Sequence, residues 1–101
     1  MSKEKEIDIQ FTQNDKRGEF TLYVNGEHSG EMTFVYKEKD VISVNHTGVN
    51  SELKGQGLGK YLMEEMVKFA RKNGLKVIPT CPYVKITIDR TPEYQDVLLE
   101  Q

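Results

Sequence analysis

The sequence predicts an α+β (α/β) domain built on a mixed, mostly antiparallel sheet that carries one β-α-β unit. Three observations support this fold class: four successive segments have strand patterns, one long amphipathic helix follows them, and a short apolar segment follows the helix. Strands joined by short turns pair antiparallel, whereas strands joined through a helix pair parallel by a right-handed crossover. At 101 residues, the chain is expected to form a single domain over residues 1–101, with residues 1–6 disordered.

The first half of the chain is expected to form an antiparallel meander. Apolar residues alternate with polar ones around residues 7–12, 20–24 and 32–36, which is the period of a half-buried strand. Residues 41–49 are rich in β-branched side chains and predict a fourth strand. The dipeptide Asn25-Gly26 favours a hairpin turn, because both residues tolerate positive φ.

The second half is expected to begin with a helix that starts near Gly57 and runs to Asn73. Its apolar residues recur at helical spacing and form one face, namely Leu58, Leu62, Met66, Phe69 and Ala70. Gly74 suits the C-terminal cap, because glycine adopts the left-handed conformation without strain. Residues 75–78 then predict a short strand that completes the β-α-β unit.

The C-terminal segment allows two interpretations. Pro82 could begin a helical turn, whereas the β-branched residues among 84–88 favour a strand. Residues 92–99 predict a short closing helix.

Composition limits the classes of function. The chain is 37% hydrophobic and 30% charged, with a net charge of −2, so it lacks the basic excess of a nucleic-acid-binding protein. Its first six residues are too charged for a secretory signal, and no apolar run approaches a membrane span. Cys81 is the lone cysteine, which excludes an internal disulfide and fits a reducing cytoplasm. We therefore expect a cytoplasmic protein with neither a nucleic acid nor a membrane as partner.

The most informative segment is Lys54-Gly55-Gln56-Gly57-Leu58-Gly59-Lys60, which lies between a predicted strand and a predicted helix. A glycine-rich turn that enters a helix leaves backbone N–H groups unpaired at the positive end of the helix dipole, which favours phosphate. The spacing matches neither a P-loop nor the dinucleotide fingerprint Gly-x-Gly-x-x-Gly. Tight packing at a helix start remains the alternative explanation for these glycines.

The same segment resembles the acetyl-CoA pyrophosphate loop of the GCN5-related N-acetyltransferases, Arg/Gln-x-x-Gly-x-Gly/Ala. One position departs from the pattern, since Lys54 stands where Arg or Gln is usual. His46-Thr47-Gly48-Val49 and Pro79-Thr80-Cys81-Pro82-Tyr83 are similar to segments of the very small single-domain branch of this family. The resemblance covers roughly residues 19–99.

The resemblance implies a minimal acyl-CoA N-acyltransferase fold, acetyl-CoA as cofactor, and transfer of acetyl to a primary amine on a small molecule or a protein. It implies that Thr47 and Val49 pair with the pantetheine arm and that the glycine loop holds the pyrophosphate. The cofactor-binding residues are then Thr47, Val49, Lys54, Gly55, Gln56, Gly57, Leu58, Gly59 and Lys60. The family's C-terminal strand pair is missing, so the acceptor cleft is expected to be open.

His46 and Cys81 are the two candidate catalytic residues. An imidazole titrates near neutral pH and suits a general base, although a strand histidine can also simply bond a neighbour. The Cys81 thiol could take the acetyl group transiently or give a proton to the leaving thiolate, although a lone cysteine is commonly a small buried apolar residue. His28, His46 and Cys81 do not have a zinc spacing, so no metal is expected.

Two rival functions remain open from the sequence. One is a non-catalytic module that binds CoA or acetyl-CoA, and the other is an interaction domain whose glycine loop is purely structural. Acetyl transfer that depends on His46 or Cys81 would separate the enzyme from the binding module.

Overall fold

The computed structural model describes residues 6–50 and 57–99, in which strands and helices follow one another in the expected order. The elements are β1 (Ile7–Gln13), β2 (Arg17–Val24), β3 (Glu27–Glu38), β4 (Val41–Val49), α1 (Gly59–Asn73), β5 (Lys76–Ile78), α2 (Pro82–Arg90) and the 3₁₀ helix η2 (Pro92–Val97). Residues 1–5 of the expected disordered segment lie outside the described residues. Glu6 is described, and its backbone exchanges hydrogen bonds with Asn25.

The described strands form one sheet in the order β1-β2-β3-β4-β5. The first four pair antiparallel, and β4 pairs parallel with β5 across α1. The predicted meander and β-α-β unit are therefore confirmed. Beyond β5, Leu98 bridges to Val77 in parallel, so the chain returns to this edge of the sheet after α2 and η2.

Turn residues have the conformations that the sequence predicts. Asn25 and Gly26 both adopt positive φ, of 52° and 83°, in the turn between β2 and β3. Gly74 caps α1 with φ 65°. At the other end, α1 begins at Gly59, two residues later than predicted, because Gly57 has a left-handed φ of 71° and precedes the first helical turn.

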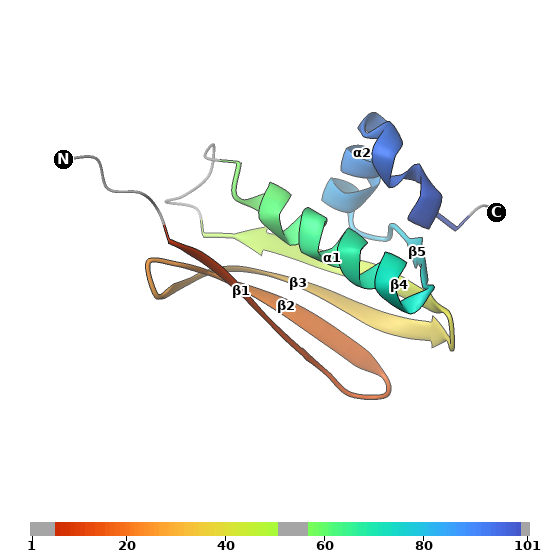
Figure 1. Ribbon diagram of the computed structural model, residues 1–101, viewed down its shortest axis with the longest axis horizontal. Coiled ribbons are helices and arrows are strands. Elements are labelled where there is room, and N and C mark those ends of the chain that lie inside the picture. The colour runs from red at the N-terminus through yellow and green to blue at the C-terminus, as the bar shows by residue number, and fades with distance from the viewer. Residues whose placement is uncertain (1–5, 51–56, 100–101) are drawn as a thin grey trace.

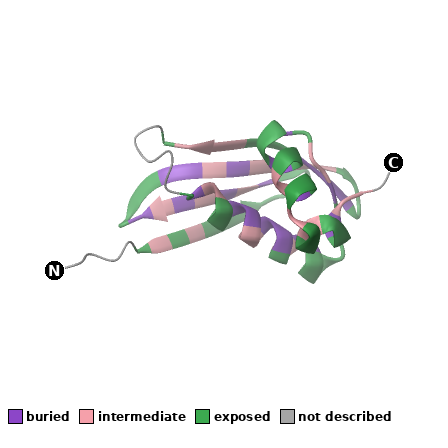
Figure 2. Ribbon diagram, turned by 90° about the horizontal axis from the view of Figure 1, so that it is seen from above, coloured by how far each residue is buried: buried purple, intermediate pink, exposed green. Residues whose placement is uncertain are grey.

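Helices α1 and α2 lie on the same side of the sheet (Figure 1). Buried residues alternate with less buried ones along the central strands, because only one face of the sheet meets the helices (Figure 2). The core includes Phe20, Leu22, Met32, Phe34, Ile42, Val44, Leu62, Met66, Val77, Val84 and Ile88. No described helix covers the opposite face, which we call the open face.

A β-bulge divides β4 into two halves. Phe34 of β3 pairs with Val44, and Thr33, its neighbour on β3, pairs with His46. Asn45 between Val44 and His46 has no paired residue on β3 and is the extra residue of the bulge. Val44 faces the core, and simple alternation would send His46 there too. The extra residue reverses this alternation, so His46 faces the open face and Thr47 faces the core beside Met32.

The ambiguous C-terminal segment is a helix. Pro82 occupies its first turn, where a missing N–H costs nothing. Val84 and Ile88 are one helical turn apart, and both are fully buried in the core. This burial outweighs the strand preference of their β-branched side chains. The closing helix forms as η2, and Arg71 of α1 binds Asp96 at its end at 2.8 Å.

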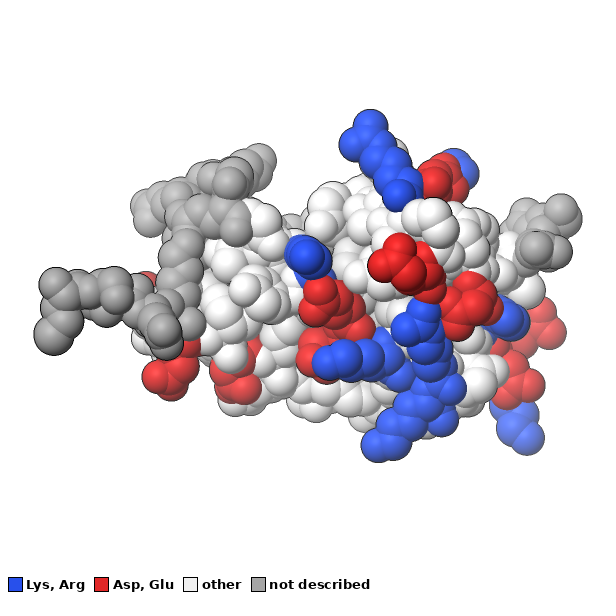
Figure 3. Space-filling view, turned by 45° about the horizontal axis from the view of Figure 1, so that its top comes forward, with Lys and Arg blue, Asp and Glu red and all other residues white. Residues whose placement is uncertain are grey.

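The surface carries charges of both signs. In the view of Figure 3, Lys and Arg side chains lie next to Asp and Glu side chains rather than in a separate patch. None of the helices within residues 6–50 and 57–99 is long and apolar enough to span a membrane.

Candidate functional site

The second half of β4 loses its neighbour on the β5 side. Val41–Ser43 pair with Lys76–Ile78, and Cys81 N–H then donates to Val44 O at 2.8 Å. After this bond the chain turns into α2, while β4 continues to Val49 with β3 as its paired strand among the described residues. The two parallel strands therefore separate beside Cys81. Apart from the Thr47 N–H, which bonds the Cys81 thiol, no strand of the described residues pairs with this edge of residues 46–49, so the edge suits an extended ligand.

Cys81 lies at the point of separation, at the N-cap position of α2, and it is 6% exposed. Burial raises the pKa of its thiol, but hydrogen bonds from the Val84, Tyr83 and Thr47 N–H groups, together with the nearby Thr47 hydroxyl, outweigh burial. The net effect is a pKa below the ordinary value for cysteine. The first turn of a helix and a neighbouring strand edge thus favour the thiolate at this position.

Thr47 connects β4 to this thiol. Its hydroxyl is buried and has no well-formed hydrogen bond to any residue that the structure describes, although it lies close enough to Cys81 to lower the pKa of the thiol. A buried hydroxyl without a firm partner is costly unless a ligand or water completes it. Thr47 thus places a polar group between the strand edge and the Cys81 thiol.

His46 lies on the other face of the same strand. Its Nε2 atom is 3.0 Å from Oε2 of Glu31, and Nε2 of His28 is 3.4 Å from Oε1 of the same carboxylate. Consecutive residues of a strand point to opposite faces, so the structure groups Cys81 with Thr47 on one side of β4 and His46 with Glu31 on the other. Neither Glu31 nor His28 was a candidate from the sequence.

The N-terminus of α1 has the features of an anion site. No side chain of the described residues caps it, and its first turn contains no acidic residue. Gly57 combines positive φ with open space where a Cβ would point, while Lys60 is exposed. Leu58 instead packs in the core at 3% exposure, so its side chain serves the fold. The candidates Lys54, Gly55 and Gln56 lie outside the described residues.

The helix starts of α1 and α2 lie side by side. A Cβ on Gly59 would come within 2.7 Å of the Tyr83 hydroxyl, so the absence of a side chain allows the tyrosine to lie against the first turn of α1. Tyr83 is two residues from Cys81. The uncapped amides of α1, the Cys81 thiol and the free edge at Thr47 therefore border one region. Val49, the last residue of β4, packs partly buried against the core.

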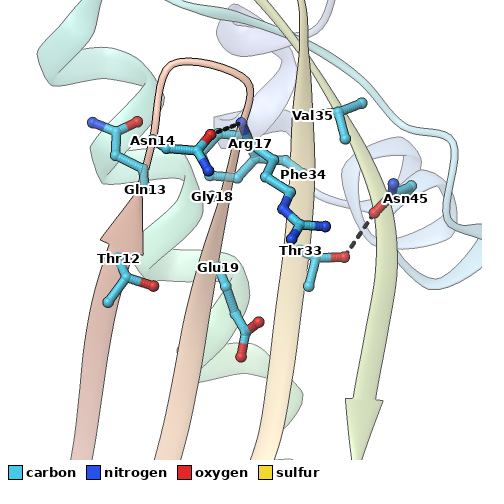
Figure 4. Close-up of a pocket in the computed structure, with 10 residues that line it drawn as sticks. All are labelled: Thr12, Gln13, Asn14, Arg17, Gly18, Glu19, Thr33, Phe34, Val35 and Asn45. Atoms are coloured by element: carbon cyan, nitrogen blue, oxygen red, sulfur yellow. Dashed lines mark hydrogen bonds between the residues drawn. The ribbon is translucent and has the colours of Figure 1, made fainter.

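A hollow on the open face lies apart from this region. It has a volume of about 470 Å³ and is lined by residues including Arg17, Glu19, Thr33 and Asn45 (Figure 4), and both helices pass behind it. Within the part of the chain that the structure describes, no group of His, Cys, Asp and Glu side chains has the geometry of a metal site.

Comparison with known proteins identifies the family. A family model described as GCN5-related N-acetyl-transferase matches residues 19–97. This chain belongs to that family. Among its relatives, Protein NATD1 of Gallus gallus is 29% identical over 85 residues, which are 83% of this chain and 77% of that protein. Protein NATD1 of Homo sapiens is 27% identical over 85 residues, with 83% and 75% covered.

Solved structures of the family share the fold. The NMR structure of a GCN5-like protein from Staphylococcus aureus is 33% identical, with a TM-score of 0.69 over 91% of this chain and 89% of that one. The aminoglycoside N-acetyltransferase AAC(6')-Iy in complex with CoA is 12% identical, with a TM-score of 0.65 over 100% of this chain and 92% of that one. The predicted acyl-CoA N-acyltransferase fold is thus confirmed.

Proposed function

We propose that this chain transfers the acetyl group of acetyl-CoA to a primary amine. The observation that carries the proposal is the separation of β4 from β5 beside Cys81, next to the uncapped start of α1. A free strand edge suits the extended, amide-containing pantetheine arm, which can pair with backbone groups near Thr47 and Val49.

The start of α1 would hold the pyrophosphate. Backbone N–H groups at Gly57, Leu58 and Gly59 precede or begin the helix, where the dipole favours negative charge. The exposed Lys60 would add a positive charge at the same end. Lys54, Gly55 and Gln56 complete the proposed loop on the resemblance of the sequence alone.

The acceptor amine would approach from the open face. Acetyl-CoA supplies the acetyl group as a thioester. His46 would accept the proton that the amine loses as its nitrogen bonds to the carbonyl carbon and the C–S bond breaks. If the Cys81 thiol gives its proton to the leaving thiolate, both sides of β4 contribute to one reaction.

Cys81 has two roles to distinguish. A thiolate-favouring site suits transient transfer of the acetyl group to Cys81 sulfur, followed by attack of the amine. A thiol with a lowered pKa is also a better proton donor to the leaving thiolate. Intact-mass measurement after mixing with acetyl-CoA separates these roles, because the first leaves an acetyl adduct that Cys81→Ala abolishes.

Calorimetric titration with acetyl-CoA tests the proposed cofactor site. Gly57→Glu should abolish binding, because it places a carboxylate at the phosphate position. Gly26→Glu is the matched control, since Gly26 also has positive φ and open space around its Cβ position but lies in a hairpin. We expect micromolar binding, about −8 kcal/mol, to wild type and Gly26→Glu and none to Gly57→Glu. Failure of wild type to bind would contradict the proposal.

Binding without catalysis would favour the rival function, a CoA-binding module. Acetyl transfer to a panel of primary amines, measured by release of free CoA thiol, distinguishes the two. An enzyme requires transfer that falls in His46→Ala or Cys81→Ala, whereas the module binds acetyl-CoA and leaves every amine unmodified.

A further inference from the structure

One carboxylate of the open face lies between two imidazoles. Glu31 of β3 places Oε2 3.0 Å from Nε2 of His46 and Oε1 3.4 Å from Nε2 of His28. The Glu31 side chain is 28% exposed, whereas the two histidine side chains are more than half exposed, at 57% and 55%. The carboxylate is therefore the more enclosed member of the group.

Gly48 provides the space in which this pair lies. Gly48 is directly opposite Glu31 in the sheet. A Cβ on Gly48 would come within 2.6 Å of Oε2 of Glu31 and 3.2 Å of Nε2 of His46. Gly48 is not among the glycines with positive φ, so its backbone conformation does not require glycine. Glycine is needed here because the carboxylate of Glu31 and the imidazole of His46 lie where a side chain would be.

The bulge at Asn45 determines which residue faces the carboxylate. Because Asn45 is the extra residue, His46 points to the open face. Its direct partner on β3 is Thr33, and Glu31 is the next residue of β3 on the same face. The next residue, Thr47, faces the opposite side and contacts the Cys81 thiol. The imidazole and the residue that contacts the thiol thus occupy adjacent positions of β4, at the point where β4 and β5 have separated.

We propose that Glu31 is a positioning residue for His46 and that Nδ1 of His46 is the atom that takes the proton of the acceptor amine. This inference rests on the proposed acetyl transfer. An ionised carboxylate only accepts hydrogen bonds, so Nε2 of His46 donates to Glu31. In the neutral ring the lone pair then lies on Nδ1. Glu31 fixes both the ring nitrogen that is free and the direction in which it points.

His28 has a supporting place in the same arrangement. Its Nε2 lies 3.4 Å from the other oxygen of Glu31, and its ring lies edge-on to Tyr23, with centroids 6.1 Å apart. A carboxylate held from both sides has fewer orientations than one held from a single side. The Glu31 carboxylate, whose own orientation is restricted, therefore restricts the orientation of the His46 ring.

Two variants break the pair in different ways. Glu31→Ala removes the acceptor. Gly48→Ala displaces the carboxylate instead, at little cost to the fold, because the atom in its way is the end of a flexible side chain. Glu19→Ala is the control, since Glu19 lies on the open face of the neighbouring strand and accepts a bond from Thr21 rather than from a histidine.

We expect Glu31→Ala and Gly48→Ala to lower kcat at least about tenfold and to leave KM for acetyl-CoA within about twofold. Glu19→Ala should change neither. A general loss of structure would instead alter both constants and the melting temperature. Equal kcat values for Glu31→Ala and Glu19→Ala would overturn the proposal.

An NMR measurement tests the placement without activity. The Hε1 proton of His46 should show a nuclear Overhauser contact to the Hα protons of Gly48, because Cε1 lies 3.5 Å from the Cβ position of Gly48. A long-range proton–nitrogen spectrum of the neutral ring should show Nε2 protonated. Glu31→Ala should lose the contact, and its persistence would overturn the positioning role. If wild type acetylates no amine, the proposed function fails, and this measurement still decides where Glu31 holds the ring.

Discussion

The two halves of β4 have different environments. Val41–Val44 are all buried, and their backbone is bonded on both sides, to β3 and to β5 or Cys81. His46–Val49 are exposed or half-buried and pair with β3 alone among the described strands. One bulged residue, Asn45, separates them. A single strand therefore supplies a core segment and, directly after it, a segment whose backbone and side chains can meet ligands.

The contrast shows how a chain of 101 residues can have both a packed core and an open site. The first half anchors β4 through burial, and its rigidity fixes the position of the second half. The second half is less buried and does not pair with β5. In exchange, His46 and Thr47 point to opposite faces at the place where the sheet opens.

The largest expected effect comes from the open half. His46→Ala should lower the rate of acetyl transfer by about 10²–10⁴, the usual contribution of a general base. It should change the free energy of unfolding by less than about 0.5 kcal/mol, because the side chain is exposed. Initial rates and urea denaturation measure the two quantities. Full activity in this variant would remove His46 from the reaction.

A substitution in the buried half, Val41–Val44, should lower stability rather than activity. Ile42→Ala should destabilise the fold by about 2–5 kcal/mol, because Ile42 is fully buried and a cavity would remain. Ile86→Ala is the matched control, since Ile86 is 51% exposed on α2 and should change the free energy of unfolding by less than about 0.5 kcal/mol. Urea denaturation gives both values, and similar losses would show that the contrast in burial does not decide stability.

The smallest expected effect concerns the link between the open half and Cys81. Thr47→Val removes the hydroxyl that helps to lower the pKa of the thiol. The thiolate is then less stabilised, so the pKa should rise and the pH at which alkylation by iodoacetamide reaches half its maximal rate should move upward. Thr12→Val, in the exposed strand β1, should leave that pH unchanged. An unchanged or lower pH in Thr47→Val would contradict the effect assigned to the hydroxyl.

Local patterns predicted most of the fold. Alternation along β1 to β3, the Asn25-Gly26 turn and the Gly74 cap are each decided by neighbouring residues, and each is confirmed. The segment around Val84 was ambiguous, because β-branched residues favour strands in isolation while burial against the core decides for a helix here. That burial depends on residues far away in the sequence.

The site was less predictable for the same reason. The sequence drew attention to His46 and Cys81, and the structure places Cys81 where the strands separate. Their grouping could not be predicted, because it depends on the bulge at Asn45, which turns His46 to the open face and Thr47 to the core. Glu31 is 15 residues from His46 and meets it only through the register of β3 and β4. An acidic residue at an open-face position of β3 was the available signal.

Backbone amide NMR during titration with acetyl-CoA tests the central claim most directly. The account predicts that chemical shift changes gather at residues 46–49, at 57–60 and at 81–84, while residues 41–44 and the open-face hollow around Arg17 change little. Changes centred on that hollow, or none at millimolar acetyl-CoA, would contradict the claim that the free half of β4 and the starts of α1 and α2 form the cofactor site.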